Sequence, residues 1–198
     1  MMIAYKKREI KENPYNAIVV FVINIILFAA LGYFVVVSFF GNARTVGHSM
    51  NNTLMDGDVV LINQFVYQLR NPKRYDVIVF KPKVETVSEK YIKRIIGLPG
   101  ETVQIIDGRV YIDGHALEDD VITTRIYNAG LANEPIKLGD DEYFVLGDNR
   151  NSSDDSRYAN IGNVRMREII GKAWLVVYPF KDFGGTAANQ IEEETEAK

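Results

Sequence analysis

The stretch Thr102–Ile112, TVQIIDGRVYI, decides the fold class of this 198-residue chain. Two runs rich in valine and isoleucine flank Asp107-Gly108, a dipeptide that is typical of the two-residue turn of a β-hairpin. Turn-forming residues also precede and follow this stretch, so neither run extends far along the chain. We therefore expect antiparallel β-structure here.

Runs of similar composition continue on both sides of the hairpin. They are rich in Val, Ile, Tyr and Phe, and turn formers separate them. Convincing helical periodicity is absent from this region, apart from a short turn expected at Gln64–Leu69. We predict a mostly β fold, with one continuous sheet system closed on itself. The expected strands are Asp58–Asn63, Asp76–Phe80, Tyr91–Gly97, Thr102–Ile106, Arg109–Ile112, Glu142–Leu146 and Ala173–Tyr178.

A long apolar segment, Ala17–Phe40, precedes the β-rich region and carries no charge. As a helix it would span about 36 Å, enough to cross a hydrocarbon core of about 30 Å. Several Lys and Arg residues precede the segment, whereas Arg44 is the one cation soon after it. This positive-inside bias places the N-terminus in the cytoplasm and the β-rich region across the membrane.

Two other interpretations of the apolar segment are disfavoured. Gly41-Asn42-Ala43 resembles the small-x-small site of a cleaved secretory signal. The segment exceeds the usual apolar core of such a signal, which is about 7–15 residues, so an uncleaved anchor is favoured. A buried helix of a soluble protein is disfavoured because no face of the segment is polar.

The domain prediction follows from these segments. Residues 1–16 form a cytoplasmic N-terminus, 17–40 a transmembrane anchor helix, and 41–180 an extracytoplasmic β-rich domain. Within that domain, residues 113–137 contain many turn formers and are expected to be a surface insertion. Residues 181–198 are expected to be a disordered acidic tail, because they are polar and rich in glutamate near the end.

Composition excludes several classes of function. The formal net charge is −3, and the last eight residues account for it, so the rest of the chain gives no reason to expect nucleic-acid binding. Cysteine is absent, which excludes disulfides, a thiolate nucleophile and thiolate metal sites.

Three polar segments could carry chemistry. Ser49 lies in GHSM, shortly after the apolar segment, and Lys93 lies inside the apolar run YIKRIIG. The third is the polar loop Gly147–Arg157, GDNRNSSDDSR. A serine hydroxyl needs a base to take its proton, and a lysine can be that base when burial lowers its pKa. A Ser–Lys dyad needs no histidine.

Plainer interpretations exist for each segment. Ser49 could belong to a linker, and a strand lysine usually extends its charge to solvent. His48 is expected to be a spectator, because its neighbour in an extended segment points the other way. The polar loop lacks the central glycine of a calcium-binding loop, so we expect a turn-rich loop tied by its own Asp–Arg bonds and no metal or other cofactor.

The order of the motifs resembles the type I signal peptidases of bacteria, particularly the single-anchor Gram-positive forms. The resemblance rests on GHSMNNTLMDGDVV, RYDVIVFKP, YIKRIIGLPGETV and GDNRNSSDDSR behind an apolar anchor, and it runs to about Pro179. It implies a membrane-bound serine endopeptidase of β-rich fold that removes signal peptides from exported preproteins at the outer face of the cell membrane. The implied partners are signal peptides and the lipid bilayer, and we expect a monomer.

The resemblance also implies residue roles. Ser49 is the nucleophile, whose backbone N–H also serves the oxyanion hole, and Lys93 is the general base. Ser153 orients the lysine, and Asp155 and Arg157 support the site. The substrate pockets are implied to be lined by Met50, Leu54 and Ile92.

The chain departs from the family pattern at three positions. Gly47 stands where some members add a hydroxyl to the oxyanion hole, and Asn52 stands where proline is usual. Tyr75 replaces a common glycine, which puts a glycine-dependent backbone geometry in doubt. Neither the serine nor the lysine is affected.

Two further function hypotheses stay open. A related Ser–Lys protease could act on itself or on a regulator, although such proteins usually lack the anchor. A non-catalytic relative could bind signal peptides without cutting them, although the chain keeps both Ser49 and Lys93.

Overall fold

The computed structural model describes residues 14–82, 90–118, 120 and 122–186. The chain divides between Ser38 and Phe39 into two units, and the described residues of the first are helical whereas those of the second are rich in β-strands. The fold is mostly β with one N-terminal helix, as the sequence predicts. Residues 1–13 of the predicted cytoplasmic segment 1–16, and residues 187–198 of the predicted tail, lie outside the described residues.

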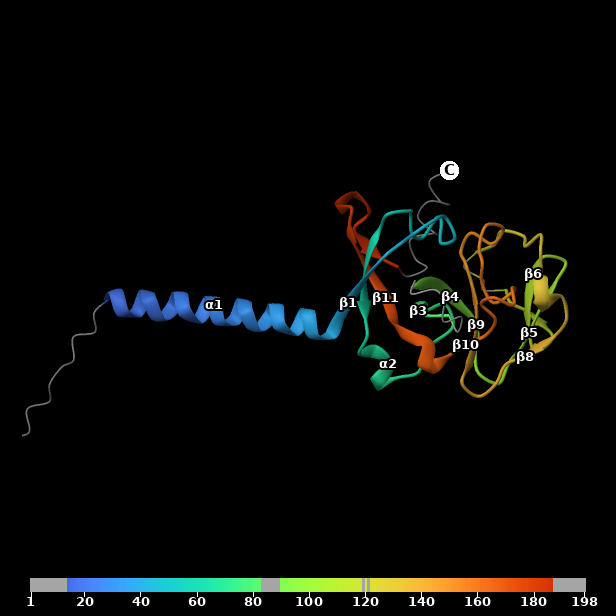
Figure 1. Cartoon of the computed structure of the whole chain (residues 1–198), viewed down its shortest axis with the longest axis horizontal. Coiled ribbons are helices and arrows are strands. Elements are labelled where there is room, and N and C mark those ends of the chain that lie inside the picture. The colour runs from blue at the N-terminus through green and yellow to red at the C-terminus, as the bar shows by residue number, and fades with distance from the viewer. Residues whose placement is uncertain (1–13, 83–89, 119, 121, 187–198) are drawn as a thin grey trace, which may run out of the picture. The chain divides into compact units, whose positions relative to one another are not determined.

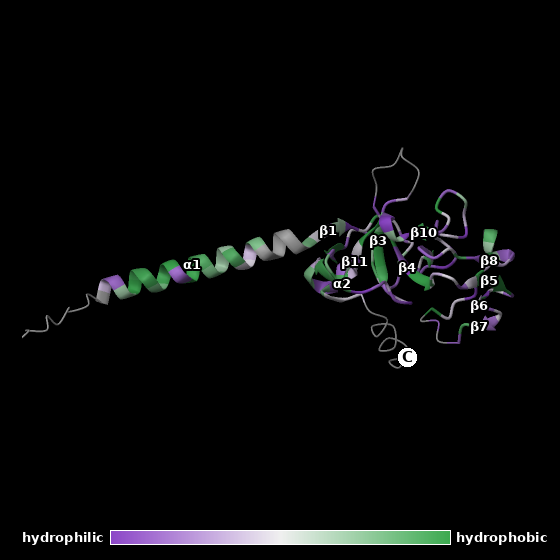
Figure 2. Cartoon of the chain, turned by 90° about the horizontal axis from the view of Figure 1, so that it is seen from below, coloured by the Kyte–Doolittle hydropathy of each residue, from purple (hydrophilic) through white to green (hydrophobic). Residues whose placement is uncertain are grey.

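The N-terminal helix α1 spans Pro14–Phe39, so it begins slightly before the predicted anchor and ends one residue earlier. Its stretch Tyr15–Phe34 is long and apolar enough to cross a membrane, and none of it is buried within the protein. Figure 2 shows hydrophobic residues along the length of this helix. The side-chain amide of Asn24, within this apolar stretch, donates a hydrogen bond to the carbonyl of Val20, which satisfies that donor within the helix.

The larger sheet of the β-rich unit has eight strands within the described residues. Its paired strands are antiparallel within the described residues, and the long β11 lies between β2 and β3. In sheet order the strands are β1 (Phe40–Arg44), β2 (Val59–Asn63), β11 (Ile169–Tyr178), β3 (Val77–Phe80), β4 (Tyr91–Gly97), β9 (Glu142–Leu146) and β10 (Val164–Arg165), and β12 (Gly184–Gly185) pairs with β11 off this path.

A second, four-stranded sheet contains the predicted hairpin Thr102–Ile112. Strands β5 and β6 pair through Val103–Ile112 and Ile106–Arg109, as the Asp107-Gly108 turn predicts. Figure 1 shows this sheet at the opposite side of the β-rich unit from β1 and β11. Its order is β7 (His115–Ala116), β6 (Arg109–Ile112), β5 (Thr102–Ile106) and β8 (Ile136–Lys137).

The prediction of one continuous closed sheet is therefore wrong. Strand β4 ends at Gly97, and the turn at Pro99-Gly100 sends the chain away before β5 begins. Gly100 has φ +80°, a left-handed conformation that glycine adopts without strain. The hairpin consequently builds its own sheet instead of extending the larger one.

The prediction of a disordered tail is also wrong for residues 181–186. The helical turn η3 spans Phe180–Asp182, and β12 then pairs with Leu175 and Val176 of β11. Thr186 is buried and its hydroxyl donates to the carbonyl of Ala173. Backbone pairing with a central strand orders this segment despite its polar composition.

Three buried apolar clusters support these sheets. One joins the start of the β-rich unit to β2, β3, β4 and β11 and includes Met50, Leu54 and Ile92. The second packs the smaller sheet against β9. Segment 113–137, predicted as a surface insertion, contributes the buried Ile126 and Ala132 to this cluster. The third lies around Ile78, Phe80 and Ile95. The remaining short elements are α2 (Val66–Leu69), η1 (Gly130–Asn133) and η2 (Met166–Glu168).

Candidate active site

Ser49 and Lys93 meet at one point although they come from distant parts of the sequence. Ser49 lies in the turn that follows β1, and Lys93 lies near the start of β4. The Nζ atom of Lys93 and the Oγ atom of Ser49 are 2.7 Å apart and hydrogen bonded. The lysine is only 3% exposed, so its amine is held against the serine hydroxyl away from bulk water.

Burial lowers the pKa of Lys93 from 10.5 to about 8. The dominant cause is desolvation, which disfavours the charged ammonium, while Asp155, Asp154 and Asp148 oppose it by raising the pKa. Among the described residues, Lys93 forms no ion pair that would hold it charged. A substantial fraction of the amine is therefore neutral at mildly alkaline pH, as a proton acceptor requires.

The neighbouring cation, Arg94, is also buried, but it has an acidic partner. It points to the opposite face of β4 and is fully buried. Its guanidinium forms a two-pronged ion pair with Asp148, with Nε–Oδ1 and Nη2–Oδ2 distances of 2.8 and 2.6 Å. It also donates to the Thr53 hydroxyl in the segment that carries the nucleophile. Arg94 therefore links β4, the polar loop and the nucleophile segment.

The sequence predicts that at least one of these two cations is partly buried, and in the structure both are. Arg94, Asp148 and Thr53 were not predicted as site residues. The signal was present, because an arginine among large apolar strand residues needs a buried acidic partner. The sequence could not show which of the nearby aspartates that partner is.

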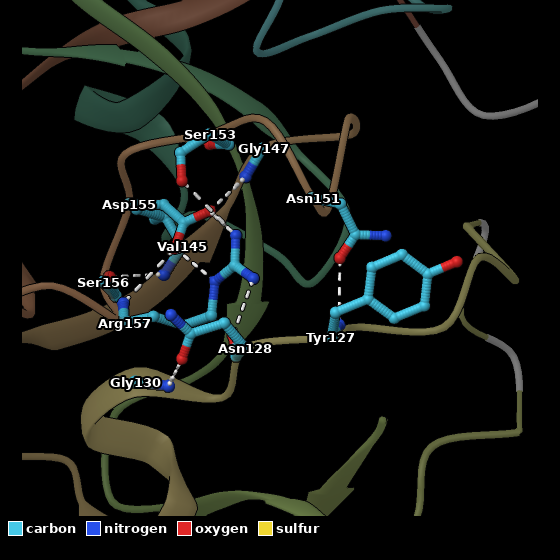
Figure 3. A network of polar contacts seen from close by, with 10 residues as sticks. All are labelled: Tyr127, Asn128, Gly130, Val145, Gly147, Asn151, Ser153, Asp155, Ser156 and Arg157. Atoms are coloured by element: carbon cyan, nitrogen blue, oxygen red, sulfur yellow. Dashed lines mark hydrogen bonds and ion pairs between the residues drawn. The ribbon is translucent and has the colours of Figure 1, made fainter. Parts of the chain in front are cut away.

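The polar loop Gly147–Arg157 is held by its own ion pair, as expected. Both side chains of Asp155 and Arg157 are buried, with Nε–Oδ1 and Nη2–Oδ2 distances of 2.8 Å. Asp155 also accepts from the backbone N–H of Gly147, and Arg157 donates to the carbonyl of Asn128 in the segment 113–137 (Figure 3). This network fixes the loop beside the Ser49–Lys93 pair.

Ser153 lies in this loop, but its predicted bond to Lys93 is not seen. Its Oγ atom is buried and has no hydrogen-bond partner among the described residues. It nevertheless lies close to the nucleophile, because a Cβ added to Gly147 would clash with Ser153 Oγ and lie 2.5 Å from the carbonyl oxygen of Ser49. Only glycine at position 147 lets Ser153 and Ser49 approach from the same side.

A cleft of about 610 Å³ opens onto the serine and lysine. Its walls are residues 42–50 and 90–93, together with Ser152 and Asp154. Of the predicted pocket residues, Met50 and Ile92 line the cleft, whereas Leu54 is fully buried beneath it in the same apolar cluster. His48 also lines the cleft.

The backbone at Tyr75 answers the doubt raised by the missing family glycine. Its φ is +71°, so tyrosine here adopts the left-handed conformation that glycine adopts readily. The Tyr75 carbonyl accepts a hydrogen bond from Arg94, and the ring packs against the second apolar cluster. These contacts hold the conformation without glycine.

The described residues contain no group of three or more His, Asp or Glu side chains placed to hold a metal ion. The polar atoms gathered at the site are instead a hydroxyl, an amine and the paired charges behind them. A neutral amine hydrogen bonded to a serine hydroxyl can activate that hydroxyl as a nucleophile.

The chain is similar in sequence to known signal peptidases. The chain is 38% identical over 153 residues to a probable signal peptidase I-2 of Synechocystis sp., covering 74% of this chain and 67% of the relative. It is 39% identical over 155 residues to a signal peptidase I of Leptolyngbya laminosa, covering 74% and 73%. A crystal structure of a signal peptidase I from Enterococcus faecalis covers 52% of this chain and 97% of its own, with 34% identity and a TM-score of 0.42.

The family model described as signal peptidase, peptidase S26, matches residues 16–178, which include all but the first two residues of α1, Ser49, Lys93 and the whole polar loop. The chain belongs to the signal peptidase family, peptidase S26.

Proposed function

We propose that this protein is a membrane-anchored serine endopeptidase that removes N-terminal signal peptides from exported preproteins, with Ser49 as nucleophile and neutral Lys93 as general base. The observation that carries the proposal is the 2.7 Å contact between Lys93 Nζ and Ser49 Oγ, made by a lysine whose pKa burial lowers to about 8.

The chemistry proceeds in two stages. Neutral Lys93 takes the proton of the Ser49 hydroxyl while Oγ attacks the carbonyl carbon of the peptide bond. The resulting ammonium then gives its proton to the leaving amine, and an acyl–enzyme ester remains on Ser49. In the second stage Lys93 takes a proton from water while the water oxygen attacks the ester carbonyl, and the ammonium then returns the proton to the leaving Ser49 oxygen, which restores the hydroxyl and the neutral amine. The backbone N–H of Ser49 donates to the developing oxyanion.

Supporting residues hold Lys93 and Ser49 in position relative to each other. Arg94 ties the nucleophile segment to the polar loop through Thr53 and Asp148. The Asp155–Arg157 pair holds the loop against Gly147, and we assign Ser153 the role of orienting the lysine once a proton is transferred. Positioning of this kind contributes strongly to rate, because small displacements of reacting groups are costly.

The substrate lies in the cleft as an extended strand. Strand β1 is at the end of the larger sheet, so its outer edge can pair with an added peptide. The cleft follows this edge and the first residues of β4, and Met50 and Ile92 form part of its floor. Their side chains leave room for small residues before the cut, the Ala-x-Ala pattern of signal peptides.

The anchor brings enzyme and substrate into one plane. We assign α1 to the membrane, with the N-terminus in the cytoplasm because the preceding segment is rich in Lys and Arg. Ser49 follows Phe40 so closely that an extended chain between them spans about 30 Å. A signal peptide held in the same bilayer therefore meets the nucleophile at raised effective concentration.

Purified full-length protein incubated with a preprotein in lipid vesicles tests this proposal. Mass spectrometry should show a mature product that begins directly after Ala-x-Ala, and Ser49→Ala should give none. Thr123→Ala is a matched control, because this exposed hydroxyl residue lies outside the cleft. Cleavage at another kind of site, or equal cleavage by Ser49→Ala, would contradict the proposal.

A further inference from the structure

Asp154 is an exposed carboxylate on the wall of the cleft that holds Ser49 and Lys93. Its neighbours in the polar loop, Ser153 and Asp155, are buried. Unlike Asp155, it forms no ion pair or hydrogen bond with another described residue. The Asp154 carboxylate therefore has no structural partner among the described residues. It lines the cleft in which we place the substrate.

The positive and negative residues that line the cleft come from different parts of the fold. Arg44 and Lys90 line the part formed by β1 and the start of β4, where Lys90 Nζ donates to the carbonyl of Asn42. Asp154 lies on the part formed by the polar loop. Its charge reaches the reacting groups, because it is among the carboxylates that raise the pKa of Lys93 against the larger effect of burial.

The proposed function fixes which part of a substrate meets Asp154. The residues before the cut lie between β1 and the start of β4, above Met50 and Ile92. The chain after the cut must then leave the nucleophile on the other side, toward the polar loop. Asp154 is the charged residue that lines the cleft there.

We propose that Asp154 is a specificity-determining residue that reads the charge of the first residues after the cut, favouring Lys or Arg and disfavouring Asp or Glu. This inference rests on the proposed function, since it concerns the leaving part of the same substrate. An exposed charge pair contributes modestly, which corresponds to about a two- to fivefold change in kcat/KM. The preference weakens at high salt, because exposed charges are screened.

Two peptides test the inference with full-length enzyme in detergent. Both carry Ala-x-Ala before the cut, and they differ in having Lys or Glu at the first two positions after it. The measured quantity is the ratio of kcat/KM for the Lys peptide to that for the Glu peptide. Any effect of a variant on Lys93 itself acts on both peptides alike and cancels in this ratio.

Wild type should prefer the Lys peptide by about two- to fivefold at low salt. Asp154→Asn should bring the ratio close to one, Asp154→Lys should invert it, and Asp140→Asn should keep it, because Asp140 is exposed but lies outside the cleft. The same ratio in wild type and Asp154→Asn overturns the inference while leaving the proposed function standing. Failure of wild type to cut either peptide overturns the proposed function and the inference with it.

Discussion

The amine nitrogen of Lys93 lies 2.7 Å from the hydroxyl oxygen of Ser49, across a sequence separation of 44 residues. Lys93 is buried on a central strand, and burial lowers its pKa to about 8. A buried lysine without an acidic partner is destabilising for a fold, so its presence beside a serine is best explained by chemistry.

The pH dependence of activity should report the neutral form of Lys93. Because only the deprotonated amine can accept the serine proton, kcat/KM should rise with pH through a midpoint near 8 and then level off. A peptide substrate assayed from about pH 6 to pH 10.5 measures this. A midpoint at the unperturbed lysine value of 10.5 would show that Lys93 is not desolvated as described.

The lowered pKa of Lys93 also predicts how the stability of the fold depends on pH. Between about pH 8 and pH 10.5 Lys93 binds a proton in the unfolded chain but not in the folded one. The free energy of unfolding should therefore gain from this group as pH rises through that window. Lys93→Met lacks this contribution. Plots of the free energy of unfolding against pH, measured by urea unfolding, should therefore converge for wild type and variant as pH rises through this window.

Asp155→Asn should destabilise the protein by about 3–5 kcal/mol, because it leaves the buried Arg157 charge without its partner. Urea unfolding measures the loss, with Lys181→Ala as the control, since Lys181 is 79% exposed and pairs only loosely with Asp182. Asp155 is the carboxylate that raises the pKa of Lys93 most, so its neutralisation should lower that pKa further. In Asp155→Asn the midpoint of the rise of kcat/KM with pH should therefore move to lower pH than in wild type. Unchanged stability would contradict the buried pair.

Gly147→Ala should abolish cleavage at normal substrate concentrations. Its methyl group would clash with Ser153 and press on the Ser49 carbonyl, so the nucleophile segment has to move. Gly139→Ala is the matched control, because a Cβ there meets Glu142 at ordinary contact distance. Steady-state kinetics and circular dichroism together separate displacement of the site from unfolding, and normal kcat in Gly147→Ala would refute the close approach.

Substrate selectivity should follow from the floor of the cleft. Because Met50 and Ile92 are large and held in the core, the residue just before the cut should have to be small. Replacing Ala with Phe at that position should reduce kcat/KM by about a hundredfold or more, because steric rejection exceeds the usual discrimination per methylene. Met50→Ala should partly restore cleavage of the Phe peptide, and no change in selectivity would exclude Met50 as a wall.

Much of the fold could be predicted from local sequence. The hairpin at Asp107-Gly108 and the other expected strands are present, with β11 extending further toward its start than predicted. Strand β1, FGNAR, was missed because it lacks β-branched residues and alternation, and pairing with β2 forms it instead. The division into two sheets depends on long-range pairing that no local pattern specifies.

Some residues of the candidate site could be predicted from the sequence, whereas the contacts of others could not. The contact of Ser49 with Lys93 could be anticipated only from the joint order of the motifs, which resembles that of the type I signal peptidases. Taken singly, a serine after an anchor and a lysine in an apolar strand favour plainer interpretations. Arg94 carries a similar sequence signal, but its partner Asp148 could be chosen only from the fold. The position of Ser153, buried without a bond to Lys93, depends on the packing around Gly147 and could not be read from the sequence.

The most direct test of the Ser49–Lys93 dyad is a double-mutant comparison of preprotein cleavage by wild type, Ser49→Ala, Lys93→Met and the double variant. Circular dichroism should show that each remains folded. Because nucleophile and base act as a unit, each single change should lower kcat by at least about a thousandfold, and the double change should cost no more than either alone. Near-normal turnover in either single variant, or losses that multiply in the double variant, would contradict the dyad.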